Sequence, residues 1–171
     1  VDEVVVVTGY HYAQIEPAVE TFPVTVVRNP HPEDGQQSSV RLGLEALGEK
    51  FDVVLVVLAD QPLIGTADLT ELISAFKKRP SGSIIVPVVN GQRGNPIVLS
   101  MEAATEILGS DKKLACRKFI ENNPDKVYQY ETANDRFTLD LDTQEDLQAF
   151  EKRTGWKLAL PKPAHAKTDA A

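Results

Sequence analysis

Short, unbroken apolar runs recur along the chain and alternate with segments of helical period. Runs of Val, Ile and Leu of this length are typical of strands that are covered on both faces, as in parallel sheets. The runs predicted as strands are 4–7, 24–27, 53–58, 84–89 and 97–99.

Apolar residues three and four positions apart predict helices between and after these runs. Thr66 is a candidate N-cap for one helix, and Thr143 followed by Asp146 resembles a capping box for another. The alternation of the two kinds of segment predicts an α/β fold, a three-layer sandwich with a mostly parallel sheet. The expected helices lie around 38–47, 66–76, 103–108, 115–120 and 143–150.

Composition narrows the functional classes. The chain has 171 residues, a length that suits one α/β domain, and a net charge of −7, which makes it a poor non-specific binder of nucleic acid. A single cysteine, Cys116, excludes intramolecular disulfides and cysteine-rich zinc sites. No apolar stretch approaches the roughly 20 residues of a membrane span. We therefore expect a cytoplasmic protein that binds neither membrane nor nucleic acid.

Asp60 is the strongest candidate for chemistry. Ligands of parallel α/β sheets bind beyond the carboxyl ends of the strands, and the segment VVLVVLADQP places Asp60 directly after the buried run 53–58. A lone carboxylate there can bind Mg²⁺ while nucleotide phosphates and water complete the coordination. The alternative is an Asp that only bonds the amides of its own turn or caps the next helix.

A second acidic segment, TLDLDTQEDL, follows late in the chain. In an extended segment Asp140 and Asp142 share one face, so together with Asp60 they would form a divalent-metal site. The alternative is that this acidity, including Glu145 and Asp146, only complements the dipole of the following helix.

Two glycine-containing segments are further candidates. In EDGQQSSVRLGL, Gly35 permits a tight turn, and Ser38 and Ser39 at a helix start could face an anion or a polar ring edge. The segment is not a Walker loop, and the plain alternative is a helix N-cap. In NGQRGNP, Arg93 could hold a substrate phosphate through its guanidinium fork, or could simply be a solvated turn residue.

Taken in order, these segments resemble a known family. VTGY, RNP, GQQSSVRLGL, VVLADQP, GQRGNP and LDLDTQEDL are similar to the molybdenum-cofactor nucleotidyltransferases (MobA-like NTP transferases), and most of all to the cytidylyltransferases that mature molybdenum hydroxylases. The resemblance implies a Rossmann-like nucleotide-diphospho-sugar transferase fold over residues 1–155, followed by a flexible C-terminal tail, 156–171. It also implies transfer of CMP from CTP to molybdopterin with release of pyrophosphate.

The resemblance assigns roles residue by residue. Mg²⁺ is the implied cofactor, with Asp60 and Asp142 as its ligands and Asp140 as a further candidate ligand. CTP and molybdopterin are the implied small-molecule partners, and a molybdenum hydroxylase is the implied recipient. Gly35, Ser38 and Ser39 match the loop that meets the nucleobase, and Arg93, Gly94, Asn95 and Pro96 lie at the acceptor pocket; Asn95 stands where the cytidylyltransferases often have His.

One family segment has no counterpart in the sequence. The family opens with a strand and a glycine-rich loop, Leu-Ala-Ala-Gly-x-Ser-x-Arg-x-Gly ending in Lys, which wraps the triphosphate. The sequence begins at Val1, where the family's second strand would lie. We therefore expect little transferase activity from this chain alone. Two other functions remain open: transfer to another small phosphate such as a sugar phosphate, and a non-catalytic nucleotide-binding or scaffold module.

Overall fold

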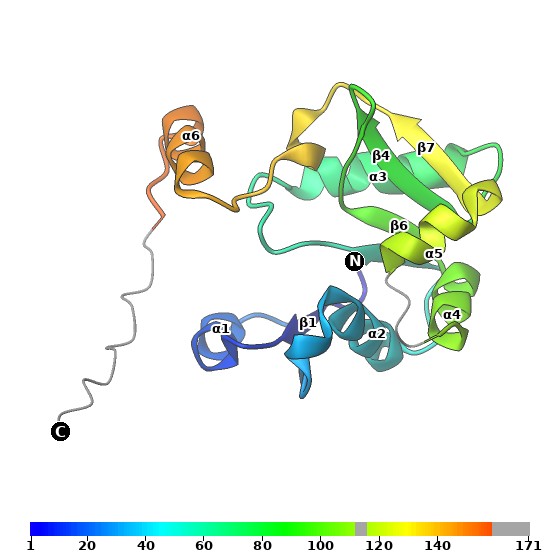
Figure 1. Ribbon diagram of the computed structural model, residues 1–171, viewed down its shortest axis with the longest axis horizontal. Coiled ribbons are helices and arrows are strands. Elements are labelled where there is room, and N and C mark those ends of the chain that lie inside the picture. Colours follow the sequence, from blue (N-terminus) through cyan, green and yellow to red (C-terminus); the bar gives the residue numbers. More distant parts are fainter. Residues whose placement is uncertain (112–115, 159–171) are drawn as a thin grey trace.

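Two separate sheets organise the computed structural model, which describes residues 1–111 and 116–158 (Figure 1). The larger sheet has five strands in the order β3-β6-β4-β5, with β7 also paired to β4, and the smaller sheet pairs β1 with β2. Helices cover both faces of the larger sheet, so the predicted three-layer α/β architecture is confirmed. The strands of the larger sheet are β3 (Val53–Val56), β4 (Ile84–Val89), β5 (Gln92–Arg93), β6 (Ile97–Ser100) and β7 (Val127–Glu131).

The larger sheet is mixed in direction. β6 runs antiparallel to both of its neighbours, β3 and β4, while β4 and β7 are parallel. As a result β3, β4 and β7 all point the same way, and their carboxyl ends meet at one edge of the sheet. The register places Val54 opposite Leu99 and Ile84 opposite Val127.

Each face of the larger sheet buries its own core. One core includes Ile84 and Val86, and it is closed by α2 (Gln36–Leu47), α4 (Met101–Gly109) and α5 (Cys116–Asn122). The other includes Ile85 and Val98, and it is closed by α3 (Thr66–Lys78) and the 3₁₀ turn η3 (Asp135–Thr138). Alternate residues of β4 enter opposite cores, as the two-residue period of a strand requires.

The smaller sheet consists of β1 (Val5–Thr8) and β2 (Thr25–Arg28), which are parallel and joined by α1 (Tyr12–Val19). α2 links it to the rest of the molecule, because the helix contacts β1 and also packs against α4. Arg41 of α2 strengthens this link, since its buried guanidinium donates hydrogen bonds to the carbonyl of Ile107 at 2.6 Å and to that of Leu108, at the end of α4.

The last helix, α6 (Gln144–Thr154), projects from the body of the molecule (Figure 1). Its predicted capping box is confirmed: Thr143 Oγ1 accepts from Asp146 N at 3.1 Å, and the Asp146 carboxylate accepts from Thr143 N at 2.8 Å. Trp156 packs edge-on against Phe150. The predicted flexible tail therefore begins with residues that still touch α6, and its remainder, 159–171, lies outside the described residues.

Several sequence predictions need correction. The run 53–58 forms a strand only to Val56, and the helix expected behind Ser38 and Ser39 begins earlier, at Gln36. Ala115 of the predicted helix 115–120 lies outside the described residues. Elements that the patterns did not predict are α1, β7, η3 and the 3₁₀ turns η1 (Pro32–Asp34) and η2 (Pro124–Lys126). In the described part of the chain, no helix has the length and apolarity needed to cross a membrane.

Candidate active site

Asp60 lies beyond the carboxyl end of β3, beside the acidic segment that precedes α6. Leu141 N donates a hydrogen bond of 2.9 Å to the backbone carbonyl of Asp60, so residues 139–142 run next to the turn after β3. The structure thus places Asp60 beside the segment that carries Asp140 and Asp142, which lie 80 and 82 residues later in the sequence, and all three side chains are exposed to solvent.

The electrostatics of Asp60 reflect these neighbours. Desolvation by surrounding protein, then the negative charge of Asp140, and finally that of Asp142 raise the pKa of Asp60, while a backbone hydrogen bond opposes the rise. Like charges that lie close together without a bound cation cost free energy, so such a group favours the binding of a cation. Oxygen ligands of this kind suit Mg²⁺ or Mn²⁺. In residues 1–111 and 116–158 no cluster of three or more acidic, His or Cys side chains is already arranged for metal binding.

Gln61, which the sequence analysis did not single out, joins the two acidic segments. Its side chain is only 3% exposed. Its Nε2 donates to Asp140 Oδ1 at 2.7 Å and to the carbonyl of Phe137 at 3.2 Å. Its Oε1 is the one buried side-chain polar atom of the described residues that has no hydrogen-bond partner. Its position directly after Asp60 in LADQP was the signal available in the sequence.

The carbonyl of Phe137 also connects the candidate acceptor turn to this group. It accepts a hydrogen bond from Asn95 N at 2.8 Å. The approach is so close that a Cβ on Gly94 would lie 2.3 Å from the same oxygen, which explains why glycine is needed there. Pro96 follows through a cis peptide bond and is buried. The turn and the acidic segment therefore form one connected unit.

Arg93 lies at the entrance to a groove on the α5 face of the sheet. Its side chain is exposed and makes no hydrogen bond or ion pair within the described ranges. The groove has a volume of about 390 Å³, and its other lining residues are Val86, Ile120, Glu121, Pro124, Val127 and Gln129. A free guanidinium beside such a groove can bind an anionic group of a ligand.

The second candidate group, Gly35, Ser38 and Ser39, lies at the end of the smaller sheet. Buried Asn29 organises it: Asn29 Nδ2 donates to Ser38 Oγ at 2.8 Å and to Ser39 Oγ at 3.0 Å. Gly35 caps α2 in a positive-φ conformation (+88°). Both serines sit inside the first turns of α2, so the N-cap interpretation of these serines is wrong.

Within the residues that the structure describes, no hydrogen bond or ion pair links this second group to the acidic group around Asp60. The two sets of candidate residues belong to different sheets. Asn29 was missed as an organising residue, although it stands directly after the second apolar run, in the segment RNP.

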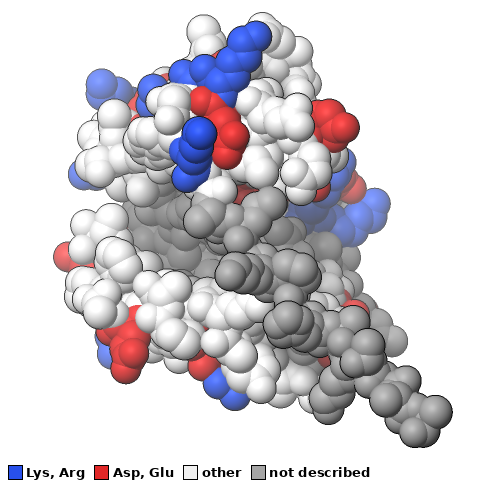
Figure 2. Space-filling view, turned by 90° about the vertical axis from the view of Figure 1, so that its left-hand side faces the viewer, with Lys and Arg blue, Asp and Glu red and all other residues white. Residues whose placement is uncertain are grey.

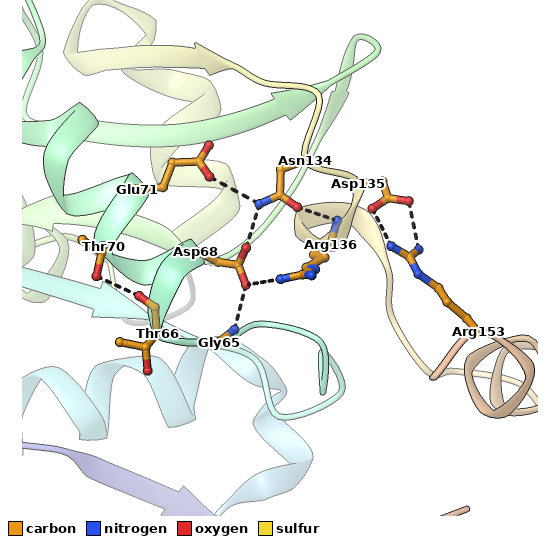
Figure 3. Close-up of polar contacts among 9 residues, drawn as sticks. All are labelled: Gly65, Thr66, Asp68, Thr70, Glu71, Asn134, Asp135, Arg136 and Arg153. Atoms are coloured by element: carbon orange, nitrogen blue, oxygen red, sulfur yellow. Dashed lines mark hydrogen bonds and ion pairs between the residues drawn. The ribbon is translucent and has the colours of Figure 1, made fainter. Parts of the chain in front are cut away.

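A buried network anchors the segment that leads into the acidic group (Figure 3). Asp68 of α3 is 3% exposed and accepts hydrogen bonds from Gly65 N at 2.8 Å and Asn134 Nδ2 at 2.7 Å. Burial opposes ionisation of Asp68, but these hydrogen bonds and Arg136 outweigh it and hold its pKa below the ordinary value. Asp135 forms a two-armed ion pair with Arg153 of α6, at 2.9 Å for each arm.

The other described arginine side chains are already engaged. Arg28 pairs with Glu16 at 2.6 Å and stacks over Tyr12, and Arg41 caps α4. On the face shown in Figure 2, basic side chains gather at the top of the view, with acidic side chains next to them.

Comparison with known proteins places the chain in a family. A model of the MobA-like NTP transferase domain matches residues 1–127. No curated protein matches the sequence.

Similar solved structures support the fold. A nucleotidyl transferase from Methanothermobacter thermautotrophicus superposes with a TM-score of 0.70 at 21% identity, over 90% of this chain and 73% of that one. Rv0371c from Mycobacterium tuberculosis, in complex with manganese, gives 0.67 at 20% identity, over 88% and 78%. Molybdopterin-guanine dinucleotide biosynthesis protein A from Archaeoglobus fulgidus gives 0.63 at 16% identity, over 88% and 78%.

Proposed function

The chain belongs to the MobA-like NTP transferase family, and from this premise we propose that it carries the catalytic carboxylates of a cytidylyltransferase of molybdenum-cofactor maturation. In the proposed reaction a phosphate oxygen of molybdopterin attacks the α-phosphorus of CTP. The bond from that phosphorus to the bridging oxygen breaks, and pyrophosphate leaves with the electron pair. The product would be passed to a molybdenum hydroxylase.

The observation that carries the proposal is the junction of LADQP with LDLD. Asp60, Asp140 and Asp142 gather beyond the carboxyl ends of strands, and the pKa of Asp60 is raised by desolvation and by the other two carboxylates. These residues fit a divalent cation: Asp60 and Asp142 would hold Mg²⁺, with Asp140 beside them. Bound there, the metal would offset charge on the phosphates during transfer.

The chain's own residues would then position the two substrates. Arg93 lies on the groove of about 390 Å³ and would bind the acceptor phosphate, with Gly94, Asn95 and Pro96 fixing the turn. Ser38, Ser39 and Gly35 would meet the nucleobase. Because phosphoryl-type transfer depends mainly on position and charge, misplacement of either group would lower the rate.

The test compares two forms of the protein: the chain as printed, and a version carrying the family's glycine-rich strand and loop ahead of Val1. Each is given CTP, GTP or ATP, with molybdopterin or a sugar phosphate, and pyrophosphate release is measured with and without Mg²⁺. We expect release from the extended form only with CTP, molybdopterin and Mg²⁺ together, and little from the printed chain.

Other outcomes redirect the proposal. Pyrophosphate release with a sugar phosphate would mean that the acceptor is a sugar phosphate and not molybdopterin. A preference for GTP would mean that the nucleotide substrate is GTP and not CTP. Nucleotide binding without release by the extended form would favour a non-catalytic module. Robust release by the printed chain would show that the glycine-rich segment is dispensable.

A further inference from the structure

We propose that Gln61 is a positioning residue for the divalent-cation site, acting through the carboxylate of Asp140. The inference rests on the proposed function, because it assumes that the acidic group binds a cation. The proposal adds a residue that does not bind the metal itself. The side-chain amide of Gln61 fixes the orientation of Asp140, whose carboxylate faces the cation site.

The first argument is the direction of the hydrogen bonds. Nε2 of Gln61 donates to Asp140 Oδ1 at 2.7 Å and to the Phe137 carbonyl at 3.2 Å. Both partners are acceptors, so the orientation of the amide is fixed by its surroundings. One oxygen of Asp140 is thereby occupied, which leaves the other for a ligand and holds the carboxylate in one orientation.

The second argument is the unpaired acceptor. Gln61 is 3% exposed, and its Oε1 has no hydrogen-bond partner among the described residues. Leaving a buried acceptor unpaired costs free energy, so such an atom calls for a donor. Oε1 belongs to the same amide whose Nε2 donates to Asp140. A hydrated divalent cation would bring water molecules, which are suitable donors, to this position.

The third argument is connectivity. The Gln61 side chain and the candidate acceptor turn share one acceptor, because the Phe137 carbonyl also accepts from Asn95 N at 2.8 Å. Through its own backbone Gln61 is adjacent to Asp60. A single side chain therefore contacts both acidic segments and shares an acceptor with the turn, which a surface glutamine could not do.

The experiment measures Mn²⁺ binding to the chain as printed, by the loss of the free-Mn²⁺ signal in electron paramagnetic resonance. The variants are Gln61→Met, which keeps the size and removes both polar atoms, and Gln148→Met, a matched control on the exposed surface of α6. We expect Gln61→Met to weaken Mn²⁺ binding about 10–100-fold, the usual effect of removing a partner of a metal-binding carboxylate. Gln148→Met should bind like the wild type.

A double-mutant cycle separates positioning from general stability. Asp140→Asn alone should weaken Mn²⁺ binding, and Gln61→Met should add little in the Asp140→Asn background, because both act through one carboxylate. Additive losses would overturn the claim that Gln61 acts through Asp140. The melting temperatures of all variants are recorded, since a purely structural residue would lower them without this coupling.

A measurement on the wild type avoids dependence on the folding of Gln61→Met. The side-chain amide resonance of Gln61 should shift on addition of Mg²⁺, while that of Gln148 should not. An unshifted Gln61 resonance in protein that binds the metal, or unchanged Mn²⁺ affinity in Gln61→Met, overturns this inference alone. A wild type that binds no Mn²⁺ instead overturns the metal-dependent part of the proposed function, and the inference with it.

Discussion

The two sheets differ sharply in how they are covered. All six residues of β4 in the larger sheet are buried, whereas three of the four residues of β2 in the smaller sheet are exposed. Val98 is 0% exposed, while Val26 is 39% exposed. Both strands contain adjacent valines, although β2 also includes Thr25 and Arg28. An apolar run therefore predicts a strand, but how fully the strand is buried depends on what packs against it.

The candidate chemistry follows the same division. At the larger sheet, Asp60, Gln61 and the acidic segment form a connected group that includes a buried, unpaired acceptor. At the smaller sheet, Asn29 satisfies Ser38 and Ser39 through ordinary hydrogen bonds. Like charges repel one another in the first group, whereas the polar side chains of the second group are hydrogen-bonded to each other. We therefore expect substitutions in the first group to lower catalysis far more than substitutions in the second.

The largest expected effect is that of Asp60→Asn on turnover by the extended form. Asn keeps the size but removes one charge from the proposed metal site, and the loss of one such electrostatic contact typically costs about 10²–10³ in rate. Pyrophosphate release measures it, with Asp125→Asn on the exposed turn η2 as the control. A folded Asp60→Asn variant with near-wild-type rates would make Asp60 structural.

The next largest effect concerns the contact between the candidate acceptor turn and Phe137. In Gly94→Ala the added Cβ would lie 2.3 Å from the Phe137 carbonyl, so backbone must move. We expect a loss of about 3 kcal/mol in the free energy of unfolding, the upper end for overpacking. Denaturant titration measures it. Gly109→Ala is the control, because a Cβ there meets nothing within 4 Å, and it should be neutral or slightly stabilising.

Much of the fold could be predicted from the sequence, because periodicity reports local structure. The run 84–89 and the capping box at Thr143 are found as predicted. The strand β7 was missed because VYQYE mixes apolar and polar residues at an edge of the sheet, where only one side is paired.

The candidate site was predictable only in part. Asp60 could be proposed from its place after a strand, but Gln61 and Phe137 act through contacts with residues more than 70 positions away in the sequence. Such contacts depend on the tertiary fold, and no local pattern encodes them. Asn29 differs, because its partners Ser38 and Ser39 lie only 9 and 10 residues further along the chain.

A smaller effect tests the network that anchors the acidic segment. Because the pKa of Asp68 is held below its ordinary 3.8, the ionised carboxylate stabilises the fold fully above that pH. This contribution is lost as the pH falls through the lowered pKa of the folded state. Asp68→Asn should cost about 2 kcal/mol at neutral pH, since hydrogen bonds to a charged group are lost.

Measurement of unfolding free energy against pH checks the sign of this effect. The deficit of Asp68→Asn relative to the wild type should shrink below pH 3.8. Asp125→Asn, on an exposed turn, should follow the wild type at every pH. A deficit that stays constant into acid would mean that Asp68 contributes through shape and not through charge.

The smallest effect returns to the two sheets with a matched pair of truncations. Val98→Ala removes two methyl groups from a side chain that is 0% exposed, and at about 0.8 kcal/mol per buried group it should cost roughly 1.5 kcal/mol. Val26→Ala removes the same atoms from a side chain that is 39% exposed in β2, and should cost less than about 0.5 kcal/mol. Denaturant titration of both variants against the wild type gives the difference directly. Equal losses would show that β2 is covered in solution as fully as β6, and the contrast between the sheets would then disappear.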